Sequence, residues 1–478
     1  MDSRNQLPTW LILASLAGFV ACSDSSTPIA DDAGRQPDDS ELAAFERPDP
    51  ETSKPKGMWY ARRDAPETPE QLSAAKALEG IGYASGSEEA RDTTGVLTLI
   101  EDRVRPGLNL WSAGHAPEAY LMDMHGEILH RWRVDPQELW ADDNRAFGFT
   151  RKARLTRDGD LLMVFAGRGV VALDWNSKVL WSYDAPAHHD VAELPDGTLV
   201  TLDRKASVFP ELHPTRVLLD DRIVFLDPET GELEGAVSLF DSLLRSEFAE
   251  AARADIAAFI QKGLEQEQRV REANPERFAN EPDLEQKLDL VGDVLHSNSI
   301  TRIGAKFAAR SELLEEGWFL VSIRNLNALA AVEVDARRQS GTVRWYRKGD
   351  WAQQHEAIAL ENGRILLFDN AGRRGRKGQA RSRVIEIDPA SGEIIESIDQ
   401  VEGRSLISLV AGASLRLDNG NTLIVESTGG TVYEVDSQGQ CVWKFVCPAR
   451  AGENDEYIAM LCHVIRVDES DVAEWLDR

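Results

Sequence analysis

Short apolar runs alternate with polar turn signals along most of the chain, and one combination of them recurs. It consists of an apolar strand that ends in Asp, a turn, and a further strand that often holds Trp. Its six copies end at Asp123, Asp174, Asp227, Asp335, Asp388 and Asp436. The copies lie about 50 residues apart, a period typical of propellers and similar arrays, except between the third and the fourth.

A second signal precedes most of these copies. Asp-Gly or Asn-Gly dipeptides stand before an apolar strand at 158–159, 196–197, 362–363 and 419–420. These dipeptides favour tight hairpins, because both central residues of such turns adopt positive φ. Two hairpins per repeat make a four-stranded antiparallel unit. Six units therefore predict an all-β fold, a six-bladed β-propeller, which we assign to residues 107–450.

The long third step contains a predicted helical insertion at residues 241–290. Its apolar residues recur at helical spacing, with charges elsewhere: Leu244, Phe248, Ala252, Ile256, Phe259, Ile260 and Leu264. The insertion is either a packing decoration or a lid or partner surface over the pocket. Residues 451–478 follow the last blade. Within them, 457–467 is expected to supply a closing strand, followed by a short helix.

The N-terminal part has the pattern of a targeting segment. Residues 1–21 resemble a secretory signal peptide, because the apolar run 10–20 is shorter than the ~20 residues that a membrane span needs. Cys22 follows small residues, so we expect a lipidated, periplasm-facing lipoprotein of the cell envelope; plain secretion is the alternative. Residues 22–57 are predicted to be a disordered tether. Residues 58–106 are expected to form a helical and extended segment.

Charge and cysteine content narrow the function. Lys plus Arg is 53 and Asp plus Glu is 81, a net charge of −28. This excess of acid disfavours nucleic acid and anionic lipid as partners, so membrane contact is expected through the lipid anchor only. Four cysteines are too few for a disulfide framework. At most one disulfide is expected among the last three, Cys441–Cys447 or Cys447–Cys462.

Three of the nine histidines occupy related places in the repeats. His189 and His355 each lie seven residues before a hairpin dipeptide, and His296 opens another blade in a similar way. Arg324 follows a strand of the His296 blade. Equivalent positions at the start of innermost propeller strands face the central channel. The sequence therefore predicts that these four side chains converge on one axial pocket.

Imidazoles beside a guanidinium suit a tetrahedral oxyanion such as a sulfuryl or phosphoryl ester. An imidazole can act as nucleophile and as general acid or base near neutral pH. A zinc site is the rival interpretation of three histidines, and the nearby arginine argues against it because two positive centres repel each other. Calcium is disfavoured by the lack of clustered carboxylates. We therefore expect neither a metal nor a cofactor, and the sequence holds no phosphate-binding loop of the Walker type.

Four stretches of the sequence resemble the bacterial arylsulfate sulfotransferases, the group that works without a nucleotide sulfate donor. The stretches are MDMHG at 122–126, HHD at 188–190, LHSNSI at 295–300 with SIRN at 322–325, and QHE at 354–356 with LFDN at 367–370. Each motif is short, but their order along the chain makes the resemblance fairly specific.

The resemblance implies a six-bladed propeller that moves a sulfuryl group from an aryl sulfate donor to a phenolic acceptor by a ping-pong route. It implies that His355 is the nucleophile and forms a sulfohistidine. The other residues of the site are expected to be catalytic, His189, His296 and Arg324, or to bind substrate, Asn298, Asn325 and Asn370.

Two other functions fit the same residues. One is a non-catalytic propeller that binds a ligand or a protein, and the other is a metal-dependent ester hydrolase on a similar propeller. Geometry separates the first from an enzyme, because an enzyme needs His355 and Arg324 within reach of one small anion in an open pocket.

Overall fold

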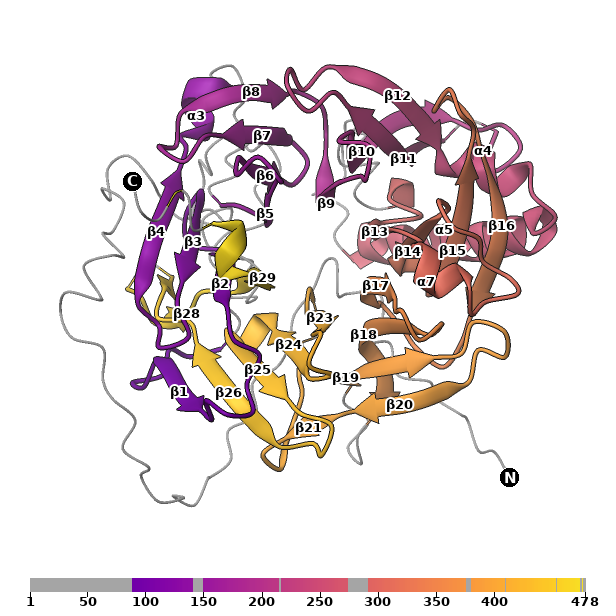
Figure 1. Cartoon of the computed structure of the whole chain (residues 1–478). Helices are drawn as coiled ribbons and strands as arrows, with labels where there is room; N and C mark the ends of the chain where they lie inside the picture. The colour runs from indigo at the N-terminus through magenta and orange to yellow at the C-terminus, as the bar shows by residue number, and fades with distance from the viewer. Residues whose placement is uncertain are drawn as a thin grey trace, which may run out of the picture.

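Six antiparallel sheets surround a common axis (Figure 1). From the axis outward, blade 1 contains β29 (Leu461–Val467), β2 (Leu108–Ala113), β3 (Glu118–Met122) and β4 (Ile128–Arg133). Blade 2 contains β5 (Lys152–Leu155), β6 (Leu161–Phe165), β7 (Gly169–Leu173) and β8 (Val179–Tyr183). Blade 3 contains β9 (His188–Glu193), β10 (Leu199–Val208), β11 (Val217–Leu226) and β12 (Leu233–Ser238).

The other three blades complete the ring. Blade 4 contains β13 (Ser297–Arg302), β14 (Phe319–Ile323), β15 (Ala328–Val334) and β16 (Gly341–Lys348). Blade 5 contains β17 (His355–Ala359), β18 (Ile365–Arg374), β19 (Ala380–Ile387) and β20 (Ile394–Ile398). Blade 6 contains β23 (Ala413–Arg416), β24 (Thr422–Glu426), β25 (Thr431–Val435) and β26 (Cys441–Val446), with β1 (Gly95–Leu99) added outside. The six-bladed propeller predicted from the repeat is confirmed.

This computed structural model describes residues 88–478 except 141–148, 215, 274–290, 375–379, 409, 453, 473–474 and 476–478. The expected signal peptide, Cys22, the tether and the start of the segment 58–106 lie outside the described residues. The smaller elements are α3 (Pro136–Leu139), α7 (Ala305–Ala308), η4 (Arg324–Leu326), η5 (Ser427–Gly429), η6 (Glu469–Asp471), the pair β21 (Gln400–Val401) and β22 (Arg404–Ser405), and the pair β27 (Arg450–Ala451) and β28 (Tyr457–Ile458).

The repeated Asp closes the turn between the third and fourth strands of every blade. In each copy its Oδ1 accepts backbone N–H groups from the turn, which is the usual reason for Asp at such a place. The tryptophan of the fourth strand then links neighbouring blades. Trp181, Trp345 and Trp443 each donate their indole N–H to the carbonyl that directly follows the repeat Asp of the next blade.

The ring closes through strands from opposite ends of the described chain (Figure 1). β29 pairs antiparallel with β2 and forms the innermost strand of blade 1. A buried ion pair joins this blade to blade 6, because Arg466 of β29 lies 3.0 Å from Glu434 of β25 and both side chains are fully buried. Arg466 also donates from Nε to Asn109 on β2, at 3.0 Å.

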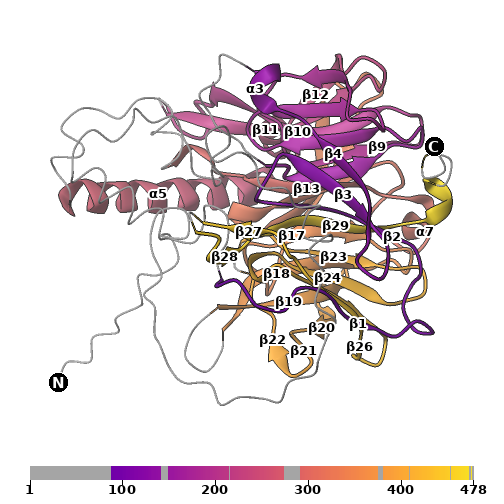
Figure 2. The same cartoon turned by 90° about the vertical axis from the view of Figure 1, so that its left-hand side faces the viewer.

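The helical insertion begins with α4 (Leu239–Leu244) and continues as α5 (Ala249–Ala273). α5 buries Ala252, Ile256 and Ile260 in the same cluster as Leu295 and Leu326 of blade 4, which explains the apolar stripe in its sequence. Part of α5 extends beyond the strands of the propeller (Figure 2). Residues 274–290 of the predicted insertion lie outside the described residues. None of the described helices is long and apolar enough to cross a membrane.

Neither of the two candidate disulfides, Cys441–Cys447 or Cys447–Cys462, is formed in this structure. Cys441, Cys447 and Cys462 are all free and buried. Cys441 begins β26 and Cys447 directly follows its last residue, so the extended strand separates their Cα atoms by roughly 20 Å. A disulfide needs its two Cα atoms within about 7 Å.

We predict that the ion pair at the ring closure is essential for stability. Replacing Glu434 by Leu leaves Arg466 buried without a counter-ion, which should lower the free energy of unfolding by ~3–5 kcal/mol in urea denaturation. Adding Arg466→Met to that variant should restore part of the loss. The matched control is Glu361→Leu, which removes the partner of the exposed Lys306 and should leave the unfolding midpoint unchanged. Equal midpoints for the two single variants would contradict this assignment.

Candidate active site

Strand pairing gives each innermost strand a reference residue from which positions can be counted. Glu193 pairs with the first residue of β10, and Ala359 pairs with the first residue of β18. Counting back four residues along the chain from each gives His189 and His355, and an irregularity of the register lies within the counted stretch of both strands. The same count in the other blades gives Arg151, Asn298, Gly412 and His463. The six counted positions thus hold three histidines, one arginine, one asparagine and one glycine near the starts of the innermost strands.

The three histidines predicted from the sequence do come together. The ring centroids of His189 and His296 are 5.0 Å apart, and those of His189 and His355 are 6.5 Å apart. His189 and His296 have positive φ, 62° and 49°. This conformation is uncommon for a residue with a side chain and is often found at functional sites.

Strand register corrects one expectation from the sequence. His296 lies six residues before Arg302, which pairs with the first residue of β14, whereas His189 and His355 lie four residues before the corresponding residues of their strands. His296 approaches His189 from the chain segment before β13. A sequence without strand pairing gives no sign of this offset.

His355 has a fixed tautomer, which its neighbours determine. Its Nδ1 lies 2.7 Å from Asn370 Oδ1 and 3.1 Å from the Gln353 carbonyl oxygen. The amide of Asn370 is oriented by Nδ2, which donates to the carbonyl oxygens of Ser408 and Ala411. Both neighbours of Nδ1 are therefore acceptors, so Nδ1 carries the hydrogen and Nε2 keeps its lone pair.

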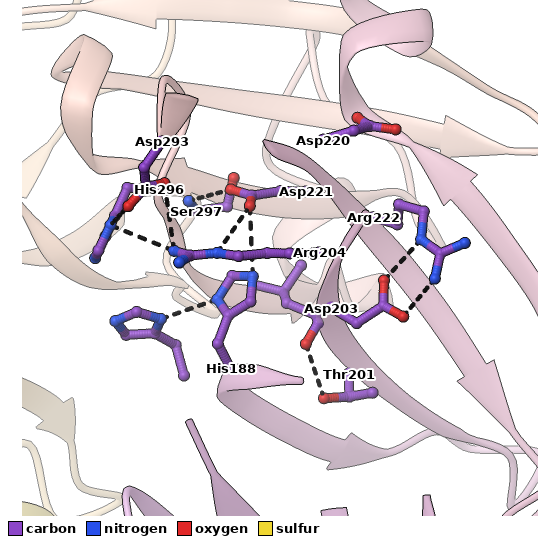
Figure 3. A network of polar contacts seen from close by, with 12 residues as sticks. His188, Thr201, Asp203, Arg204, Asp220, Asp221, Arg222, Asp293, His296 and Ser297 are labelled. Atoms are coloured by element: carbon purple, nitrogen blue, oxygen red, sulfur yellow. Dashed lines mark hydrogen bonds and ion pairs between the residues drawn. The ribbon is translucent and has the colours of Figure 1, made fainter. Parts of the chain in front are cut away.

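His296 is held by a carboxylate. Its Nδ1 lies 2.5 Å from Asp293 Oδ2. Burial alone would raise the pKa of Asp293, but Arg204 and His296 lower it overall, so the carboxylate is ionised. Arg204 lies between Asp293, at 3.5 Å, and Asp221, at 3.3 Å (Figure 3). One arginine thus connects the surroundings of two histidines.

His189 is backed by a second histidine. Its Nδ1 lies 2.9 Å from Nδ1 of His188. On the other side of His188, Nε2 lies 3.4 Å from Asp221 Oδ1 (Figure 3). The order Asp221, His188, His189 thus runs from a buried carboxylate to the group of three histidines.

Desolvation and nearby cations keep the imidazoles uncharged. Burial lowers the pKa of His355 well below its usual value, and Arg324 and Arg151 lower it further. Burial likewise lowers the pKa of His189, with added effects of His296 and Arg151. His355, which is 5% exposed, therefore offers a neutral imidazole at pH 7.

Arg324 belongs to the same group of residues. It begins η4, directly after β14, and its Nη1 donates to Asn325 Oδ1 at 2.8 Å. Its positive charge lowers the pKa values of both His355 and His296. The structure therefore brings all four predicted catalytic residues to one place.

The three asparagines expected to bind substrate serve different contacts in the structure. Asn370 orients His355 as described above. Asn325 donates from Nδ2 to the Asp293 carbonyl oxygen at 2.7 Å and so ties η4 to the segment that holds His296. Asn298 donates from Nδ2 to the Gln354 carbonyl oxygen at 2.7 Å, while its buried Oδ1 has no hydrogen-bond donor among the described residues.

A buried ion cluster lies one residue further along the innermost strands. Lys152 Nζ is 2.8 Å from Asp190 and 2.7 Å from Glu356. These three residues directly follow Arg151, His189 and His355, so the cluster joins blades 2, 3 and 5 beneath the histidines. It holds the positions of three residues of the site relative to one another.

Two of the six counted residues, Arg151 and His463, were not predicted from the sequence. Arg151 lies seven residues before the dipeptide at 158–159, the same spacing that identified His189 and His355, so the sequence contained its signal. His463 had no such signal, because its strand pairs with β2 from the other end of the chain and no hairpin dipeptide follows it. Among the described residues, no group of three or more His, Cys, Asp and Glu side chains is arranged to hold a metal ion.

Comparison with solved structures gives distant similarities. A protein of unknown function from Bacteroides caccae is 14% identical, with 75% of this chain and 98% of that chain covered and a TM-score of 0.45. A streptogramin B lyase is 12% identical, with 77% and 86% covered and a TM-score of 0.39. A virginiamycin B lyase from Staphylococcus aureus is 9% identical, with 63% and 73% covered and a TM-score of 0.33. No curated protein sequence matches the chain.

A sequence model of one protein family matches the chain over residues 152–448, which is more than half of its length. The family is arylsulfotransferase (ASST). The matched range contains all four residues of the histidine and arginine group. The chain therefore belongs to the arylsulfotransferase family, and its function is of the arylsulfotransferase type.

Proposed function

We propose that the chain transfers a sulfuryl group from an aryl sulfate to a phenolic acceptor in two steps, through a sulfohistidine at His355. The observation that carries the proposal is the tautomer of His355. Two acceptors hold the hydrogen on Nδ1, so the lone pair of Nε2 is available to attack sulfur. His296, by contrast, has a carboxylate at its Nδ1.

In the first step, Nε2 of His355 attacks the sulfur in line with the bond to the aryl oxygen. The N–S bond forms, the S–O bond breaks, and its electron pair leaves with the phenolate. Transition states of this kind are loose, so positioning and charge stabilisation supply most of the acceleration. We assign to Arg324 and Arg151 the role of holding the sulfuryl oxygens, since a guanidinium suits two oxygens at once.

In the second step, a phenol occupies the place of the departed phenol and takes the sulfuryl group from His355. The leaving oxygen needs a proton in the first step, and the acceptor must lose one in the second. Two imidazoles border the pocket for this purpose, His189 and His296. Each is connected to a buried carboxylate, His296 directly and His189 through His188.

The proposed reaction is tested with purified protein, 4-nitrophenyl sulfate and phenol. We expect release of 4-nitrophenol that depends on phenol, and formation of phenyl sulfate. His355→Asn should lower the rate by on the order of 10³-fold or more, since it removes the nucleophile. In the wild type without acceptor, mass spectrometry should find one SO₃ group on the peptide that contains His355.

The matched control is His125→Gln, because His125 lies exposed in the turn between β3 and β4. It should leave the rate unchanged. A His355→Asn rate equal to that of the control would remove His355 from the mechanism. The same assay with 4-nitrophenyl phosphate decides between sulfuryl and phosphoryl transfer, and we expect the sulfate to be the better substrate.

We predict that Asn370 is required for the nucleophile. Asn370→Leu removes the strongest acceptor for Nδ1 of His355, which lets the hydrogen move to Nε2. Loss of the correct tautomer should lower the rate of sulfohistidine formation by on the order of 10²-fold. Rapid-quench measurement of the sulfated peptide checks this. A variant that stays folded and reacts at the wild-type rate would contradict the tautomer assignment.

The pH profile should reflect the lowered pKa of His355. The reaction needs the neutral imidazole, so kcat/KM should stay constant as the pH falls through 6.5 and should decline only in more acidic solution. Arg151→Met removes one cation that lowers this pKa. The acidic decline of the variant should therefore move to higher pH. A wild-type profile already half lost at pH 6.5 would contradict this prediction.

A further inference from the structure

His188 has a polar neighbour close to each of its ring nitrogens. It is 1% exposed. Nδ1 lies 2.9 Å from Nδ1 of His189, and Nε2 lies 3.4 Å from Asp221 (Figure 3). Two residues adjacent in sequence rarely point at each other in a strand, since side chains alternate. The positive φ of His189 permits it here.

Asp221 can hold a positive charge on His188. It is fully buried, and its Oδ2 accepts the backbone N–H of Ser297 at 2.5 Å. Burial alone would raise the pKa of Asp221, but His188 and Arg204 lower it overall, so the carboxylate is ionised. Arg204 shares its charge between Asp221 and Asp293. Asp221 therefore remains available as an acceptor for Nε2–H of His188.

His189 itself is badly placed to carry a charge. Desolvation and the neighbouring His296, Arg151, His188 and Arg204 all lower its pKa. If His189 acted as a general acid by itself, it would have to become an imidazolium cation first. All of these groups disfavour that cation. The proton that reaches the substrate must therefore be held on another residue, a proton store, behind His189.

We propose that His188, held by Asp221, is this store, and that it exchanges a proton with the substrate through His189. His188 is thus a positioning residue of the transferase, which acts through His189 and does not touch the substrate. The inference rests on the proposed function and specifies which of the two candidate imidazoles handles the proton.

The proton steps balance over one reaction cycle. Before the first step, His188 is doubly protonated, and its Nδ1–H donates to Nδ1 of His189, whose hydrogen is on Nε2. As the S–O bond breaks, Nε2–H of His189 passes to the leaving phenolate oxygen, and Nδ1 of His189 takes the proton of His188. His189 stays neutral throughout. The acceptor phenol reverses these transfers in the second step and restores the charge on His188.

The test compares two donors that differ in their need for a proton. The phenolate of 4-nitrophenyl sulfate leaves readily without one, whereas that of phenyl sulfate does not. In His188→Gln, which can form hydrogen bonds but cannot release a proton, the rate with phenyl sulfate should fall on the order of 10²-fold. The rate with 4-nitrophenyl sulfate should change far less. Asp221→Asn should show the same selective loss, and His125→Gln should show none.

The outcomes separate the two proposals. If the ratio of the two rates in His188→Gln equals that of the wild type, the relay is wrong and the proposed function is unaffected. This holds whether both rates persist or both fall together. Selective loss in Asp293→Asn alone would assign the proton to His296 instead. Inactivity of the wild type with both aryl sulfates would overturn the proposed function itself.

A measurement on the wild type covers the case in which the buried variants do not fold. Two protons move together in the relay, so the rate with phenyl sulfate should fall with a curved dependence on the D₂O fraction. A linear dependence indicates one moving proton and would refute the relay.

Discussion

The pairing of β29 with β2 is the constraint on which the site depends. It closes the ring, and only a closed ring brings positions near the starts of six innermost strands around one axis. Those positions hold Arg151, His189, Asn298, His355, Gly412 and His463, residues spread over more than 300 positions of sequence. The buried Arg466–Glu434 pair lies where the first and last blades meet. Stability of the closure and geometry of the pocket therefore have the same structural origin.

The charge inside the pocket is opposite to that of the whole chain. The chain has a net charge of −28, yet Arg151, Arg204 and Arg324 all act on the histidines of the pocket. These guanidinium groups suit an anionic ester. The cations also keep the imidazoles neutral. A nucleophile needs this neutral state, whereas the same cations disfavour an imidazole that holds an extra proton. The carboxylates Asp221 and Asp293 lie behind the histidines, where they compensate charge without facing the anion.

The sequence predicted the blades well because their turns have strong local causes. The glycines of the hairpin dipeptides at 159, 197, 363 and 420 all have φ between 84° and 90°, a conformation that favours glycine. The repeat Asp binds backbone N–H groups in every blade. These signals are local, so they are visible without the fold. The convergence of His189, His296, His355 and Arg324 was also within reach, since it follows from blade count and spacing.

What the sequence did not reveal depends on pairing between distant strands. The register of β13 is irregular between Ser297 and Ser299, and no local signal marks such an irregularity. His463 enters the site only because a strand from the end of the chain completes the first blade. The links from His188 to Asp221 and from His296 to Asp293 involve short contacts that depend on side-chain orientation. Spacing alone gives no information about them.

Equivalent positions on the second strands of the blades explain why the nucleophile lies in blade 5. Arg204, Arg324 and Asn370 each stand five residues after the start of the second strand in blades 3, 4 and 5. Only blade 5 has a neutral amide there, and that amide accepts a hydrogen bond from His355 Nδ1. An arginine at this place would donate to Nδ1, force the hydrogen onto Nε2 and occupy the lone pair that attacks sulfur. One residue type at one repeated position therefore distinguishes a blade that supplies a nucleophile from blades that supply cations.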